Sequence, residues 1–188
     1  MKFQFPTRTI ALVFGLALAA TATSHADSFF LRLKGQKGGD VKGSVTLKGF
    51  EGSIQELDFE HLIVSPRDSQ TGLPTGQRQH KVLAITIPLD QTAPLLLNIM
   101  CTNEMLSDFN LTTVPTQTRA ASGVGSGNLR YTTRLTNASI ASIEHITKAD
   151  ANGANPKVYL KISFSYQKIE WTWSDGGITA MDDWEARI

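Results

Sequence analysis

Alternation of apolar and polar residues is the main pattern of this chain after residue 26. It is clearest over 158–166, where apolar residues occupy every second position: Val158, Leu160, Ile162, Phe164 and Tyr166. Because successive side chains of a strand point to opposite faces, this spacing predicts a β-strand with one face in the core. The alternation continues at Ile169, Trp171 and Trp173 on the opposite parity, so we expect a bulge between the two stretches.

The same pattern recurs in shorter form along the chain. It predicts strands over 28–33, 54–64, 80–88, 105–114, 129–135 and 138–146. The last two are expected to form a strand pair joined near Asn137. In 54–64 the two predicted faces are an apolar one, with Leu57, Phe59 and Ile63, and an acidic one, with Glu56, Asp58 and Glu60. Leu62 and Val64 are apolar although they fall on the face of the acidic residues, and this change of face predicts a bulge near His61.

One segment, 90–103, has helical spacing instead. Its apolar residues recur three or four positions apart, at Leu95, Leu96, Ile99 and Met100. Asp90 and Thr92 are candidate caps, and Pro94 suits the first turn of a helix. We therefore expect a single helix here, ending around Asn103.

Polar and glycine-rich stretches separate these elements. The loop 65–79 has about 15 residues, a length that usually indicates function or contact in a compact domain. Residues 115–128 are small and polar, and the segments 150–156 and 175–177 predict turns. The glycine-rich stretch 123–127 resembles a phosphate-binding loop, but neither a Lys nor a helix follows it, so a flexible loop is favoured.

The whole pattern predicts a mainly β fold with about eight strands and one helix. Regular strands separated by turns are typical of an antiparallel sandwich or barrel, with the helix packed on one side. The sequence has no internal repeat and no linker between domains. We therefore expect one domain over 27–188.

Residues 1–26 have the features of a secretory signal peptide. Lys2 and Arg8 supply positive charge, and residues 10–22 form an apolar run. Ser24 and Ala26 are small residues at positions −3 and −1 of a cleavage site after Ala26. The run is shorter than the roughly 20 residues that a spanning helix needs, so no membrane anchor is predicted. The expected location is secreted or periplasmic, or cytoplasmic if the leader is not functional.

Charge and cysteine content narrow the classes of function. The chain has 18 Lys and Arg against 17 Asp and Glu, a formal net charge of +1. Loss of Lys2 and Arg8 with the leader would change this charge to −1. Neither value supplies the basic surface that a nucleic-acid partner requires. The single cysteine, Cys101, excludes an internal disulfide and is expected to be buried at the helix end.

Catalytic and metal-binding patterns are absent from the sequence. It contains no GxSxG, HExxH or GxxxxGK[ST] motif. His61, His80 and His145 are far apart and show no local metal-ligand spacing, so we predict structural roles for them and no metal or cofactor. The sequence therefore indicates a protein that is not an enzyme.

Acidic and aromatic residues near the C-terminus offer weaker alternatives. Asp182, Asp183 and Glu185 suit a solvated tail better than the carboxylate pair of a glycosidase. Trp171 and Trp173 share a strand face and could form a sugar-stacking platform. Burial in the core or in a subunit contact is the favoured role for such residues.

Several stretches, taken in order, resemble the haemolysin-coregulated protein (Hcp) family of type VI secretion systems. They are 29–35 (FFLRLKG), 53–64 with 75–81, 90–97 (DQTAPLLL), 131–143 (YTTRLTNASIASI) and 162–185 (ISFSYQKIEWTWSDGGITAMDDWE). The last is the strongest match. Together they cover essentially the whole chain after residue 26.

This resemblance implies an antiparallel two-sheet β-barrel with one flanking α-helix. It also implies a non-enzymatic homohexameric ring with an open centre, which stacks into tubes and carries effectors. The implied partners are further copies of the chain and the spike, sheath and effector proteins of the system. Contacts between subunits or rings are expected at seven residues: Phe29, Arg67, Asp68, Arg78, His80, Trp171 and Trp173.

Two other functions stay open at this point. One is an extracellular carbohydrate-binding or adhesive β-sandwich protein, and the other is a secreted hydrolase. Members of the Hcp family are usually made without a cleavable signal and assemble in the cytoplasm. A signal-bearing relative could therefore have a different task from that of the tube.

Overall fold

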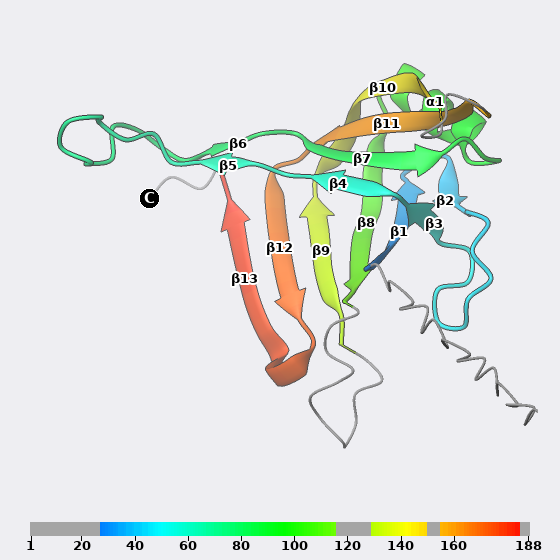
Figure 1. The fold of residues 1–188 in the computed structure, drawn as a ribbon, viewed down its shortest axis with the longest axis horizontal. Coiled ribbons are helices and arrows are strands. Elements are labelled where there is room, and N and C mark those ends of the chain that lie inside the picture. Colours follow the sequence, from blue (N-terminus) through cyan, green and yellow to red (C-terminus); the bar gives the residue numbers. More distant parts are fainter. Residues whose placement is uncertain (1–26, 116–128, 150–154, 185–188) are drawn as a thin grey trace, which may run out of the picture.

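A computed structural model describes residues 27–115, 129–149 and 155–184, and these residues form a mainly β fold, as the alternation predicts (Figure 1). The predicted signal peptide, the glycine-rich stretch 123–127 and Glu185 lie outside the described residues. The helices and strands are β1 (Ser28–Gly35), β2 (Gly39–Val41), β3 (Ile54–Glu56), β4 (Asp58–Glu60), β5 (Ile63–Val64), β6 (Gln79–His80), β7 (Leu83–Pro88), α1 (Ala93–Cys101), β8 (Met105–Val114), β9 (Tyr131–Thr136), β10 (Ala138–Lys148), β11 (Lys157–Ser165), β12 (Lys168–Trp173), the 3-10 turn η2 (Asp175–Gly177) and β13 (Ile178–Asp183).

The strands form two antiparallel layers joined by bent strands (Figure 1). One layer has the order β13-β12-β9-β8-β1-β3, and the other has the order β10-β11-β7-β4. Three consecutive pairs, β3 with β4, β9 with β10 and β11 with β12, pass from one layer to the other. Pairing can therefore be followed from β8 through β1 and the bent segment 54–60 to β7, β11 and β10, and back to β8.

One predicted pairing is wrong. The segments 129–135 and 138–146 do not pair with each other: β9 pairs with β8 and β12, while β10 pairs with β8 and β11. Asn137, which lies between them, has a φ of 50°. Asn tolerates this left-handed conformation better than most residues, and here it turns the chain from one layer into the other.

The predicted faces of 54–64 are also wrong at their start. Glu56 is buried, with 3% of its surface exposed, whereas Leu57 is 51% exposed. The segment is not one strand, because it bends at Leu57, whose N–H donates to the carbonyl of Thr86 at 2.9 Å. Counting alternation straight through the bend therefore assigns Glu56 to the outer face, although it points inward with Ile54.

The core lies between the two layers and below the helix. Its largest fully buried side chains are Phe109, Phe164, Leu31, Ile54, Leu83, Ile85, Ile87, Leu96, Leu111, Leu160, Ile162 and Ile169. The rings of Phe109 and Phe164 meet edge to face with centroids 4.9 Å apart, a favourable geometry for aromatic pairs. The core thus draws on both halves of the chain.

The helix begins as predicted, with Pro94 in its first turn, and it contributes Ala93, Leu96 and Ile99 to the core. Cys101 is exposed, so the expectation of a buried thiol is wrong. The buried helix positions recur every third residue, and Cys101 lies two residues beyond the last of them. Cys101 therefore lies outside the buried face of the helix.

Candidate functional site

The loop 65–79 is the outer part of a two-stranded ribbon that projects far beyond the sheet, past β13 (Figure 1). Strands β5 and β6 pair at its base, and Arg67 and Pro74 form a bridge nearer its end. We refer to residues 62–81 as the ribbon. The exposed large apolar side chains on it or beside its base are Leu62, Ile63, Leu73 and Val82. A two-stranded ribbon cannot bury such side chains by itself.

Arg67 and Asp68 shape the end of the ribbon. The Asp68 carboxylate accepts hydrogen bonds from the N–H groups of Thr71 at 2.7 Å and Gln70 at 3.0 Å, and these bonds lower its pKa. The Arg67 guanidinium donates to the carbonyl of Gly72 at 3.1 Å. Both predicted contact residues thus stabilise a turn, and the surface around them is exposed.

Arg78 and His80 connect the ribbon base to the last strand. The Arg78 guanidinium donates from Nε and Nη2 to the two carboxylate oxygens of Asp182, and Nη2 also donates to the carbonyl of Asp183 at 3.0 Å. His80 Nε2 lies 2.7 Å from the same Asp182 carboxylate. Hydrogen bonding by Arg78 lowers the pKa of Asp182. Asp182 is therefore an internal ion-pair partner, and the expectation that it lies in a solvated tail is wrong.

Tyr166 brings two histidines together behind this ion pair. Its hydroxyl lies 2.5 Å from His61 Nε2 and 3.0 Å from His80 Nδ1. Because His80 Nε2 faces a carboxylate, a neutral His80 carries its proton there, and Nδ1 accepts from the Tyr166 hydroxyl. That hydroxyl then accepts the proton of His61 Nε2. Burial raises the pKa of Tyr166 to about 12, with a further contribution from the Asp182 charge.

The expectation of hydrogen-bonded structural histidines holds for His61 and His80. We refer to His61, Arg78, His80, Tyr166 and Asp182 as the polar junction. It can hold the ribbon at a fixed angle to the sheet, because Tyr166 and Asp182 belong to the sheet side, while His61 directly precedes the ribbon and Arg78 and His80 lie on its returning strand. Its hydrogen bonds are all made within one chain.

The polar junction predicts that acid weakens the fold. Burial, with a smaller effect of His80, lowers the pKa of His61 below its ordinary value of about 6.5. The unfolded chain therefore binds a proton here more readily than the folded one, and the stabilising contribution of neutral His61 is complete above that value and declines as the pH falls below it. We expect the melting temperature of the native chain to fall more between pH 7.5 and 5.5 than that of His61→Gln.

His145→Gln is the control for this measurement, since His145 is exposed on β10. Its melting curve should follow that of the native chain over the same pH range. Parallel melting curves for the native chain and His61→Gln would contradict the assignment.

Phe29 and Trp173 lie in one row across the sheet. The register pairs Phe29 with Thr113, Thr113 with Tyr131, Tyr131 with Trp173 and Trp173 with Ile178. Directly paired residues point to the same face, so these five side chains share one side of the sheet. We refer to these five residues, Phe29, Thr113, Tyr131, Trp173 and Ile178, as the aromatic row. Ile178, at its end, is 66% exposed.

Trp171 lies in the next row toward the core. It pairs with Thr133, which pairs with Leu111, and both of these are buried. Trp171 itself is partly buried against the core. The seven predicted contact residues therefore occupy three places: the ribbon end, the polar junction and the sheet face. His61, Tyr166 and Asp182 are the junction residues that the sequence analysis did not place among the contacts, because no local spacing connects them to Arg78 and His80.

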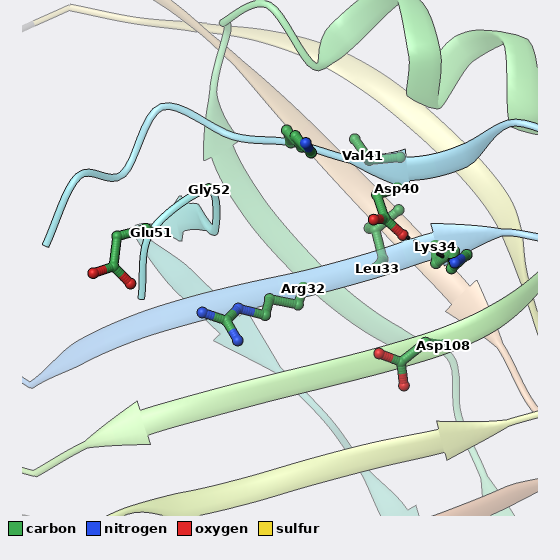
Figure 2. A pocket seen from close by; sticks show the side chains of 9 residues that line it. Arg32, Leu33, Lys34, Asp40, Val41, Glu51, Gly52 and Asp108 are labelled. Atoms are coloured by element: carbon green, nitrogen blue, oxygen red, sulfur yellow. Dashed lines mark ion pairs between the residues drawn. The ribbon is translucent and has the colours of Figure 1, made fainter. Parts of the chain in front are cut away.

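A hollow of about 460 Å³ lies beside β1 and β2 (Figure 2). Its lining carries charges of both signs, and Arg32 and Lys34, two of its three cationic side chains, have partners nearby. Arg32 donates to Ser53 Oγ at 3.1 Å and to the carbonyl of Gly49 at 3.2 Å, while Lys34 pairs with Asp40 at 3.3 Å. This arrangement resembles a solvated surface more than a site for a charged ligand.

In the residues that the structure describes, no three His, Cys, Asp or Glu side chains gather closely enough to hold a metal ion. Within the same ranges, no helix has both the length and the apolarity needed to cross a membrane.

Comparison with known proteins gives one consistent result. The family model described as "Type VI secretion system effector, Hcp" matches residues 30–173. The "Major exported protein" of Pseudomonas aeruginosa is 34% identical over 151 residues, which are 79% of this chain and 85% of that protein. The comparisons give no support to a carbohydrate-binding function.

Solved structures agree with this match. The crystal structure of an Hcp protein has a TM-score of 0.72 and 28% identity, over 86% of this chain and all of that one. Hcp1 from Escherichia coli EAEC 042 has a TM-score of 0.68 and 27% identity, over 85% of this chain and all of that one. The secreted protein Hcp3 from Pseudomonas aeruginosa, at 24% identity and a TM-score of 0.64 over 86% of this chain and all of that one, shares the fold.

Proposed function

The chain belongs to the Hcp family of type VI secretion proteins, and on that premise we propose that six copies form a ring with an open centre. The chain is a tube or secreted protein of a type VI secretion system. The family consists of structural proteins that assemble themselves into rings. We extend this to a structural, non-enzymatic role for the present chain, with effectors, spike and sheath as further partners.

The ribbon is the observation that carries this proposal. A ring needs two different contact patches on each subunit, since each copy meets one neighbour on either side. The ribbon offers the first patch, because it projects from the sheet, exposes leucine and isoleucine side chains, and is fixed at its base by Arg78 and Asp182. The aromatic row, with Phe29 and Trp173, is our second patch.

Mass measurement in solution tests the ring. At micromolar concentration we expect light scattering or sedimentation to give six times the mass of one chain. A monomer at this concentration would contradict the ring.

Loss of an apolar contact on the ribbon should weaken the assembly. We expect Leu73→Ser to shift the mass toward smaller species, because Leu73 is 64% exposed on the ribbon in the single chain. Leu95→Ser is a matched control, since Leu95 is 46% exposed on the helix.

Shortening the ribbon between Arg67 and Pro74 is the stronger change. Electron microscopy that shows unaltered ring formation and stacking would exclude the ribbon as a contact.

Cleavage of the leader after Ala26, which leaves one domain over 27–188, is part of the same proposal. The apolar run and the small residues Ser24 and Ala26 support it. N-terminal sequencing of the protein from its native host should find Asp27 first. A product that begins with Met1 would contradict cleavage and favour assembly in the cytoplasm.

A further inference from the structure

Glu56 is a buried carboxyl group without a partner. Only 3% of its surface is exposed, and neither carboxylate oxygen has a hydrogen-bond partner among the described residues. Burial alone raises the pKa of Glu56 well above its usual range, with no described positive charge that offsets it. Because an unpaired buried charge is unfavourable, carboxyl groups at such positions normally have a cation or hydrogen-bond donors nearby.

Glu56 lies close to the first described residue, Asp27. Its Cα partner across the sheet is Phe29, two residues after Asp27. Directly paired residues share a face, so the Glu56 and Phe29 side chains lie on the same side of the sheet. Figure 1 shows β3 alongside β1, where the pair Phe29 and Glu56 lies near the beginning of β1.

The distance along the strand is short. Two residues of extended chain span about 7 Å, so the backbone nitrogen of Asp27 lies about that far along the strand from Phe29, the residue opposite Glu56. In a longer chain that nitrogen is an uncharged amide. After cleavage behind Ala26 it would be an α-amino group, which has a pKa of about 7.7–8.0 and is mostly charged at neutral pH.

We propose that Glu56 is the binding site for the α-ammonium group of Asp27 that cleavage after Ala26 creates. The proposal rests on the leader cleavage proposed above. The contact forms in the processed chain, because cleavage creates a cation that the described residues do not otherwise offer to Glu56. Removal of the leader would thus supply a counter-ion to a carboxyl group that has none among the described residues, and it would fix the first strand.

The test compares the chemical reactivity of one amino group. A chain that starts at Asp27 is produced by removing a carrier protein directly before that residue, which keeps every described strand and core residue. It is treated at pH 7 with limiting sulfo-N-hydroxysuccinimide acetate, and acetylation of the N-terminal peptide is followed by mass spectrometry. We expect the Asp27 amine to react about tenfold more slowly than in Glu56→Gln, because a pairing that raises its pKa by one unit leaves about one tenth as much free base.

Two controls make the result specific. Glu60→Gln removes an exposed carboxylate from the same bent segment and should leave the slow rate unchanged. A chain that begins one residue earlier, at Ala26, displaces the amine from the carboxylate and should react at the rate of Glu56→Gln. Equal rates in the native chain and Glu56→Gln would overturn the proposal.

Thermal unfolding supplies a second readout. The chain that starts at Asp27 should melt at least ~5 °C above the full-length chain, and Glu56→Gln should remove most of this difference. If Glu56→Gln lowers both melting temperatures equally, Glu56 has no link to the processed end and the proposal fails. Because the start at Asp27 is set by design, these results do not depend on whether the host cleaves the leader or on whether the ring forms.

Discussion

Leu96→Ala should lower the free energy of unfolding by about 2–5 kcal/mol. Leu96 is fully buried on the helix, where it packs into the core between the two sheet layers. Truncation removes apolar surface from the core and leaves a cavity that the closely packed strands cannot fill. Urea unfolding followed by circular dichroism measures the change.

The neighbouring Leu95→Ala is the matched control. It is the same substitution one position along the same helix, but Leu95 is 46% exposed. We expect a change within about 0.5 kcal/mol, as for most surface substitutions. A loss as large as that of Leu96→Ala would show that burial on this helix is not what decides the effect.

The strands could be predicted from the sequence wherever one strand stays in one layer. The alternation over Leu160, Ile162 and Phe164 matches β11, in which all three side chains are buried. Alternation succeeds there because the core face of the strand stays constant over its length. The bulge expected before Ile169 is wrong: β11 ends there, and the chain passes into the other layer as β12.

The errors lie at the bends. At Asn137 and at Leu57 the chain passes from one layer to the other, and the periodicity of a sequence carries no information about which partner comes next. Glu56 shows the consequence most clearly, because both its charge and the alternation of apolar and polar residues over 54–64 predicted that it is exposed. A buried carboxyl at this position contradicts local preference, and such conflicts often mark a functional constraint.

The polar junction could not be predicted for a different reason. His61 is separated from Tyr166 and Asp182 by more than a hundred residues, and the three meet only because β12 begins and β13 ends at the ribbon base. The seven contact residues were chosen by side-chain type, and four of them, Arg67, Asp68, Arg78 and His80, make hydrogen bonds within the chain. For Arg78 and His80 the proposed role in assembly is indirect, through the angle of the ribbon.

Asp182→Asn should release the ribbon and abolish the ring. The substitution keeps the size of the side chain but removes the charge that binds Arg78 and faces His80. We expect trypsin to cleave within 62–81 at least about tenfold faster than in the native chain, because the loss of charge-assisted hydrogen bonds raises the population of the open ribbon. A ribbon without a fixed angle cannot meet the same patch on the next subunit at each of the six contacts of the ring, so the mass in solution should fall toward that of one chain.

Asp175→Asn is the control, because Asp175 is exposed in the turn between β12 and β13 and takes no part in the junction. Its cleavage rate and mass should equal those of the native chain.

Arg78→Lys tests the geometry: a lysine keeps the positive charge but cannot bind both oxygens of Asp182 in the parallel manner of a guanidinium. Cleavage at an intermediate rate is therefore expected. If Asp182→Asn unfolds at the native temperature, resists trypsin and still forms the ring, the junction does not hold the ribbon, and the contact between subunits must depend on other residues.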